Sequence, residues 1–113
     1  MAVINVYQQY FAAEGTFNGV ARHAASVLLI SDSEAGQIRY EAAVSFFPHN
    51  DETDYAVSYD AYFSKILYEA SGRRSKKREA QLLETLREEI DALAAEAGGV
   101  IFWDQPLLEA RRG

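Results

Sequence analysis

The sequence predicts an α+β domain in which a mainly antiparallel sheet of four or five strands packs on one long C-terminal helix plus a short helix. Three observations predict this class. Apolar residues alternate with polar ones over residues 37–47, Asn18-Gly19 separates two strand-like segments, and apolar residues recur at helical spacing over residues 76–97. Sheet and helix each bury one face, and packing them together buries both.

The N-terminal half reads as a three-stranded meander. Val3–Tyr7 is β-branched and aromatic, and this strand is expected to continue raggedly to Phe17, with Gly15 allowing a bulge. Asn18-Gly19 is typical of a type I′ hairpin turn because both central positions need positive φ. A second strand is expected within residues 20–31, followed by a polar turn over residues 31–36.

The third strand has the clearest pattern in the chain. One face is apolar and the other largely polar, which indicates a half-buried antiparallel strand that ends at Pro48. The apolar face carries Ile38, Tyr40, Ala42, Val44 and Phe46.

Residues 55–70 fit two periods. Val57, Tyr59 and Phe63 alternate like a strand, whereas Phe63, Ile66 and Ala70 recur like a helix. We interpret the segment as a short strand to about Tyr59 and a short helix after it.

Residues 76–97 predict the long helix, with Ser75 as N-cap and Gly98 as the left-handed residue after its end. Its apolar residues fall within about 120° of arc at 100° per residue. They are Leu82, Leu83, Leu86, Ile90, Leu93, Ala94 and Ala97. A last strand over residues 100–103 is expected to end at Gln105-Pro106, with a loosely held tail after it.

Length and composition bound the class of protein. A chain of 113 residues has the size of a single domain, so we treat residues 1–113 as one unit. Zero cysteines exclude disulfides and thiolate metal sites. No apolar run approaches the roughly 20 residues that span a bilayer, and no secretory signal is visible. We therefore expect a soluble, cytoplasmic protein without membrane contact.

Charge is segregated along the chain. The net charge is −6, yet five of the eleven basic residues fall in one six-residue run. They are Arg73, Arg74, Lys76, Lys77 and Arg78. The rest of the chain is strongly acidic, the opposite of a free nucleic-acid binder, which needs a broad basic face.

Catalytic and metal motifs are missing. His23 and His49 are the only histidines, and no zinc-protease, nucleophile-elbow, P-loop or Rossmann pattern occurs. Asn50, Glu52 and Asp54 have the i, i+2, i+4 spacing of a calcium loop but lack its glycine and distal glutamate. We expect no catalysis, no metal and no cofactor.

The acidic residues are the main candidates for partner binding. Four lie in or just after one polar loop, and three project from the solvent side of the long helix, where they could meet a basic surface. They are Asp51, Glu52, Asp54 and Asp60 in the first group, and Glu84, Glu88 and Asp91 in the second. The alternative interpretation is an ordinary solubilising face.

In size, acidity and lack of catalytic motifs, and on these same seven residues, the chain resembles the anti-CRISPR proteins, small phage-encoded inhibitors of bacterial defence. Bacterial immunity proteins that neutralise toxins have a similar character. The resemblance implies a non-enzymatic inhibitor that binds a Cas protein or surveillance complex in the bacterial cytoplasm.

Two other sets of residues leave alternatives open. The basic run could bind phosphate or nucleic acid at a helix N-terminus, or could be a solvated joint. Ile101 and Trp103 share one side of the last strand and could form an interface, including a homodimer, because Tyr and Trp are favoured interface anchors. A small hydrolase with a scattered site around His49, Asp54 or Asp60 is a third hypothesis.

Overall fold

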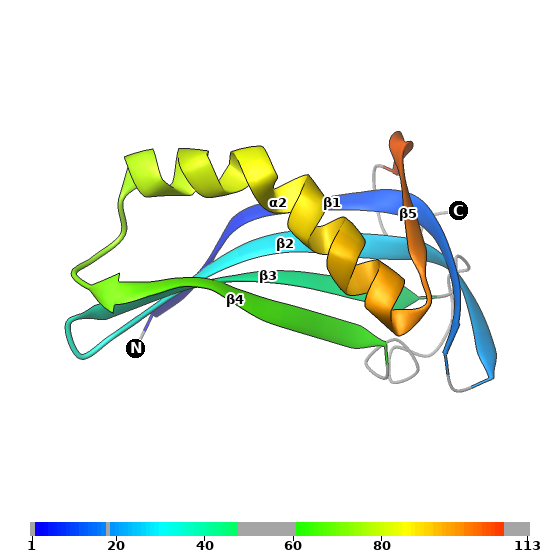
Figure 1. The fold of residues 1–113 in the computed structure, drawn as a ribbon, viewed down its shortest axis with the longest axis horizontal. Helices are drawn as coiled ribbons and strands as arrows, with labels where there is room; N and C mark the ends of the chain where they lie inside the picture. Colours follow the sequence, from blue (N-terminus) through cyan, green and yellow to red (C-terminus); the bar gives the residue numbers. More distant parts are fainter. Residues whose placement is uncertain (1, 18, 48–60, 108–113) are drawn as a thin grey trace.

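The computed structural model describes residues 2–17, 19–47 and 61–107. Five antiparallel strands form one sheet in the order β4-β3-β2-β1-β5, and the helix α2 crosses one face of it (Figure 1). The expected α+β class and antiparallel sheet are therefore confirmed. The elements are β1 (Ala2–Phe17), β2 (Val20–Glu34), β3 (Gln37–Phe47), β4 (Tyr62–Ser71), α2 (Lys76–Ala97) and β5 (Val100–Leu107).

The first three strands form the expected meander. β1 pairs with β2 from Ala2 to Phe17, with register shifts at Asn5/Tyr7 and Ala12/Gly15, so the ragged first strand is confirmed. Gly19 has a φ of 76°, as a tight turn with positive φ requires. Gly36, with a φ of 78°, sits in the second turn.

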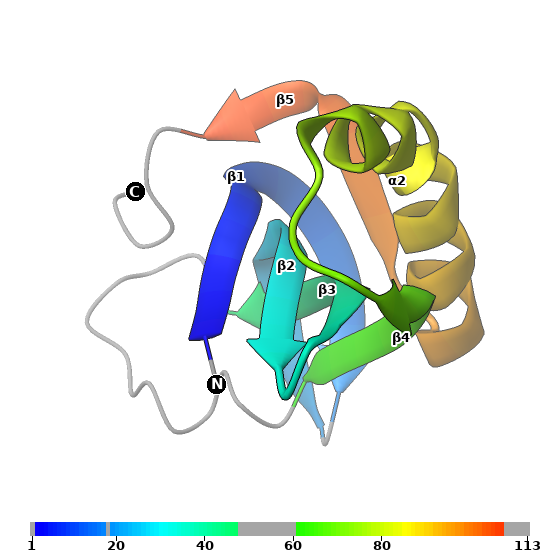
Figure 2. The same cartoon turned by 90° about the vertical axis from the view of Figure 1, so that its left-hand side faces the viewer.

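The core lies between the sheet and α2. The predicted apolar face of β3 is buried, with Tyr40, Val44 and Phe46 at 1% exposure or less. Leu86, Ile90 and Ala94 of α2 pack against it, while Leu83, which the sequence places in the same stripe, stays 38% exposed. The sheet curls, and α2 lies across its concave side between the two edge strands (Figure 2).

The expected short helix is wrong, because Tyr62–Ser71 forms the edge strand β4. Phe63 lies opposite the inward Val44, and Tyr68 lies opposite the inward Tyr40. A bulge at Leu67 shifts the alternation between them. The inward-facing residues of β4 are therefore not evenly spaced two residues apart, and their spacing resembles that of a helix. The expected strand before Tyr59 lies outside the described residues.

The last strand is longer than predicted. β5 runs to Leu107, and Pro106 lies opposite Phe11 of β1. Proline does not end the strand because β5 is at the edge of the sheet, where a missing N–H need not break a ladder.

α2 confirms the predicted long helix with its predicted caps. The Ser75 side chain accepts a hydrogen bond from the Arg78 N–H, and Gly98 has a φ of 94°. Among the described residues, no helix is long and apolar enough to cross a membrane.

Candidate interaction surface on helix α2

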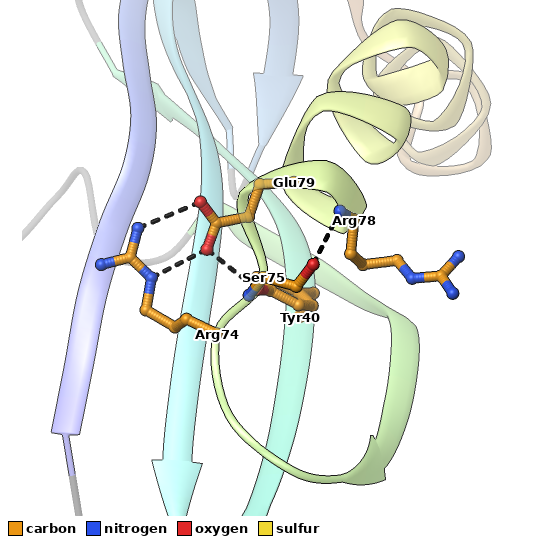
Figure 3. A network of polar contacts seen from close by, with 5 residues as sticks. All are labelled: Tyr40, Arg74, Ser75, Arg78 and Glu79. Atoms are coloured by element: carbon orange, nitrogen blue, oxygen red, sulfur yellow. Dashed lines mark hydrogen bonds and ion pairs between the residues drawn. The ribbon is translucent and has the colours of Figure 1, made fainter.

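A buried ionic network holds the N-terminal end of α2 on the sheet (Figure 3). Arg74 donates from Nε and Nη2 to the two carboxylate oxygens of Glu79, at 2.7 and 3.0 Å. The hydroxyl of Tyr40 donates to Glu79 Oε2 at 2.8 Å and accepts from the Ser75 N–H at 3.2 Å. One carboxylate thus joins the β4–α2 connection, the helix and strand β3 of the sheet.

The charges in this network stabilise one another. Hydrogen bonding to Arg74 lowers the pKa of Glu79 and outweighs burial, which acts in the opposite direction. The same bond raises the pKa of Arg74, and burial raises the pKa of Tyr40. Glu79 is only 6% exposed, and its bonds to Arg74 and Tyr40 favour the ionised form despite this burial.

Three further contacts fix the rest of the helix. Lys65 of β4 donates to Glu89 at 2.8 Å, and this bond raises the pKa of Lys65. The indole Nε1 of Trp103 donates to Asp91 Oδ1 at 2.7 Å, and the Arg87 guanidinium lies 5.3 Å from the centre of the indole ring. α2 is therefore tied to both edge strands of the sheet.

The outer side of α2 carries the predicted helical acids. We call Glu84, Glu88 and Asp91 the acidic ridge; all three are exposed. Among the described residues, neither Glu84 nor Glu88 takes part in an ion pair, whereas Asp91 is engaged by Trp103. The other predicted acids, Asp51, Glu52, Asp54 and Asp60, lie outside the described residues.

The basic run divides into two kinds of residue. Arg74 belongs to the buried network, and Arg78 packs its guanidinium 4.3 Å from the centre of the Tyr68 ring. Arg73, Lys76 and Lys77 are exposed. The structure therefore does not bring the five cations together as one anion-binding cluster.

The predicted interface pair also divides. Ile101 is only 4% exposed and belongs to the core, so it offers no area to a partner. Trp103 is partly buried, packs edge-on against Phe11 at 4.8 Å between ring centres, and bonds to Asp91. Their side of β5 is the side that faces the core and α2, so the structure gives no support to an interface through Ile101; Val100, on the opposite side, is 46% exposed.

The hypothesis of a scattered hydrolase site gains no support from the described residues. Within residues 2–17, 19–47 and 61–107, no three His, Asp or Glu side chains are grouped so as to hold a metal ion. His23 lines a surface hollow of about 570 Å³ beside Thr16 and Gly99. His49, Asp54 and Asp60 lie outside the described part of the chain.

Sequence reasoning missed Glu79, although a signal was present. At 100° per residue, Glu79 falls about 60° from Leu82, in the middle of the apolar stripe. A carboxylate at such a position must find a partner inside the protein, since an unpaired buried charge is very costly. Arg74, five residues earlier, is that partner.

With the fold and this surface established, comparison with known proteins adds no relative: no family model, no curated protein and no solved structure shows a significant match to the chain.

Proposed function

We propose that this chain is a protein-binding module that acts by association alone, and that the acidic ridge of α2 is its docking surface for a partner with a basic surface. The observation that carries the proposal is the exposure of Glu84 and Glu88 on a helix that is tied to the sheet at its start, its middle and its last third.

The fixed position of α2 on the sheet favours binding of a partner. A surface that is already ordered loses less conformational entropy when a partner docks than a mobile loop does. Carboxylates that have no internal ion pair among the described residues keep their charge available for an incoming lysine or arginine. Complementary charge speeds association and disfavours acidic competitors.

The more specific proposal is an inhibitor that covers the nucleic-acid-binding surface of a bacterial defence protein, such as a Cas protein, as the resemblance to anti-CRISPR proteins implies. An immunity protein that neutralises a basic toxin would present the same chemistry. Whether the captured partner is a defence protein or a toxin distinguishes these two proposals.

The test is capture of a partner from host lysate, followed by a binding measurement with matched charge variants. Reversal of the two free ridge residues, Glu84→Lys with Glu88→Lys, should weaken binding by about tenfold or more, because each lost attraction becomes a repulsion. Asp91 is left intact since it also bonds to Trp103.

The matched control reverses two exposed acids on the sheet, Glu14→Lys with Glu34→Lys, which changes the net charge by the same amount. If both double variants bind equally well, the ridge has no special role. If both weaken binding equally, the attraction is a general effect of net charge and the docking surface is not α2.

Nucleic-acid binding is the competing proposal. It would depend on the exposed cations of the basic run, Arg73, Lys76 and Lys77. Retention of labelled nucleic acid at low salt, with affinity that falls steeply as salt rises, would favour this alternative. Three exposed cations on a chain of net charge −6 are a small basis for such binding.

A further inference from the structure

Among the described residues, no strand covers one edge of the N-terminal part of β1, and we call this the open edge. β1 pairs with β2 along its whole length, but it pairs with β5 only from Tyr10 to Glu14. Within the described part of the chain, residues 2–9 therefore have a neighbouring strand on one side only; in Figure 2 this part of β1 borders the sheet on the left.

Of the features that normally prevent strands from pairing between molecules, this edge has only a bulge at Val6. Residues 2–9 contain no charged residue, no proline and no glycine. Two of their apolar side chains are exposed, Val3 at 59% and Ile4 at 39%. An uncharged, apolar edge with unpaired backbone N–H and C=O groups is a template for another strand.

The other two edges are protected. In β4, Lys65 lies opposite the inward Ala42 and so points inward, and Leu67 forms a bulge; both features disfavour strand addition. In β5, Pro106 lacks an N–H, and the pairing with β1 skips from Phe102 to Pro106. Among the described edge strands, β1 is the one whose open edge has neither an inward-pointing charged residue nor a proline.

We propose that residues 2–9 of β1 pair antiparallel with the same residues of a second copy, which joins the two sheets. The chemistry favours an uncharged occupant, because a charged strand would lose hydration against an edge that offers no counter-charge. β1 is itself an uncharged strand of matching length, and antiparallel pairing with itself closes under two-fold symmetry.

The length of the edge sets the strength of the contact. Eight residues extend about 26 Å at about 3.3 Å per residue. The surface area that a single strand pair of this length buries is small compared with the roughly 1,000 Å² buried in a stable specific interface. The dimer is therefore reversible and forms with rising concentration. Because this edge does not include the acidic ridge, the inference is independent of the proposed function.

Sedimentation equilibrium of the full chain from micromolar to millimolar concentration tests the proposal. The mass should rise from that of one chain, 12.6 kDa, toward twice that value. Val3→Lys should raise the dissociation constant by roughly tenfold or more, since it places a charge in the apolar contact. The matched control Val100→Lys changes another exposed valine, on β5, and should leave the dissociation constant unchanged.

Backbone amide hydrogen exchange distinguishes a second copy from other occupants of the edge. Among residues 2–9, the amides that point away from β2 are the informative ones; if their exchange slows only as concentration rises, the dimer is supported. Slow exchange of these same amides at every concentration would overturn it, because the edge would then be covered within one molecule. A constant mass of one chain, or equal weakening by Val3→Lys and Val100→Lys, would overturn it as well.

Discussion

Helix α2 carries its acidic residues in two settings that differ in solvent access and in what they contact. Glu79, in the first turn, is 6% exposed and accepts hydrogen bonds from Arg74 and Tyr40. Glu84 and Glu88, in the third and fourth turns, are exposed and have no ion pair within the described residues. The same chemical group thus fixes the helix at one end and leaves charge free along its outer side.

This difference shows that the angular position of a charged residue on a helix has to be determined before the residue is assigned a role. Glu79 faces the sheet, and its charge is neutralised inside the fold. The ridge residues face away, and their charge is retained for association. The same substitution should therefore change the stability of the fold by different amounts in the two settings.

The largest effect is expected for Glu79→Gln. The substitution leaves Arg74 without its carboxylate, so unfolding should become easier by about 2 kcal/mol. This is less than the 3–5 kcal/mol typical of a fully buried pair, because the Arg74 side chain is 39% exposed. Urea unfolding measures the change. The control Glu88→Gln should alter stability by less than about 0.5 kcal/mol; equal effects would remove the distinction between the two settings.

The same network predicts how stability depends on pH. Because Arg74 lowers the pKa of Glu79 in the folded state, the stabilisation is fully present above the unfolded pKa and is lost as pH falls through the folded pKa. The difference in unfolding free energy between wild type and Glu79→Gln should be constant near neutral pH and should shrink below about pH 4. A difference that grows on acidification would contradict the assignment.

The smallest effect is expected for Asp91→Ala, which removes the acceptor for the Trp103 indole. Loss of one hydrogen bond at an exposed site should cost about 1 kcal/mol or less. Trp103 is the sole tryptophan, so its fluorescence emission reports on the site and should shift as the indole gains contact with water. Glu88→Ala, one turn away, is the control, and an unchanged emission in both variants would mean that the contact does not persist in solution.

Much of the fold could be predicted from local pattern. The alternation in β3 and the helical stripe with Ser75 and Gly98 at its ends identified two of the elements that contribute to the core. β4 could not be identified in this way, because the bulge at Leu67 breaks its alternation and the edge of β3 selects its conformation. The length of β5 was underestimated for a related reason, since the tolerance of Pro106 depends on an edge position that only the sheet topology establishes.

The candidate surface was predicted in part. The solvent side of α2 follows directly from helical geometry, and Glu84, Glu88 and Asp91 are exposed as expected. The contacts made by the basic run, by Ile101 and by Trp103 could not be predicted from the sequence, because they depend on which side chains other elements bring close. Tyr40 lies 39 residues from Glu79 in the chain, and no local pattern connects them.

The sequence by itself determined the α+β class, the position and ends of α2 and the outward direction of its acidic ridge, because periodicity and capping are local properties of the chain. Only the tertiary structure decided that Tyr40 and Arg74 are the partners of Glu79, and that residues 2–9 of β1 have a neighbouring strand on one side only among the described residues. Burial, pairing and strand neighbours arise when distant segments pack together, and the electrostatic environment of a side chain depends on those neighbours as much as on its own identity.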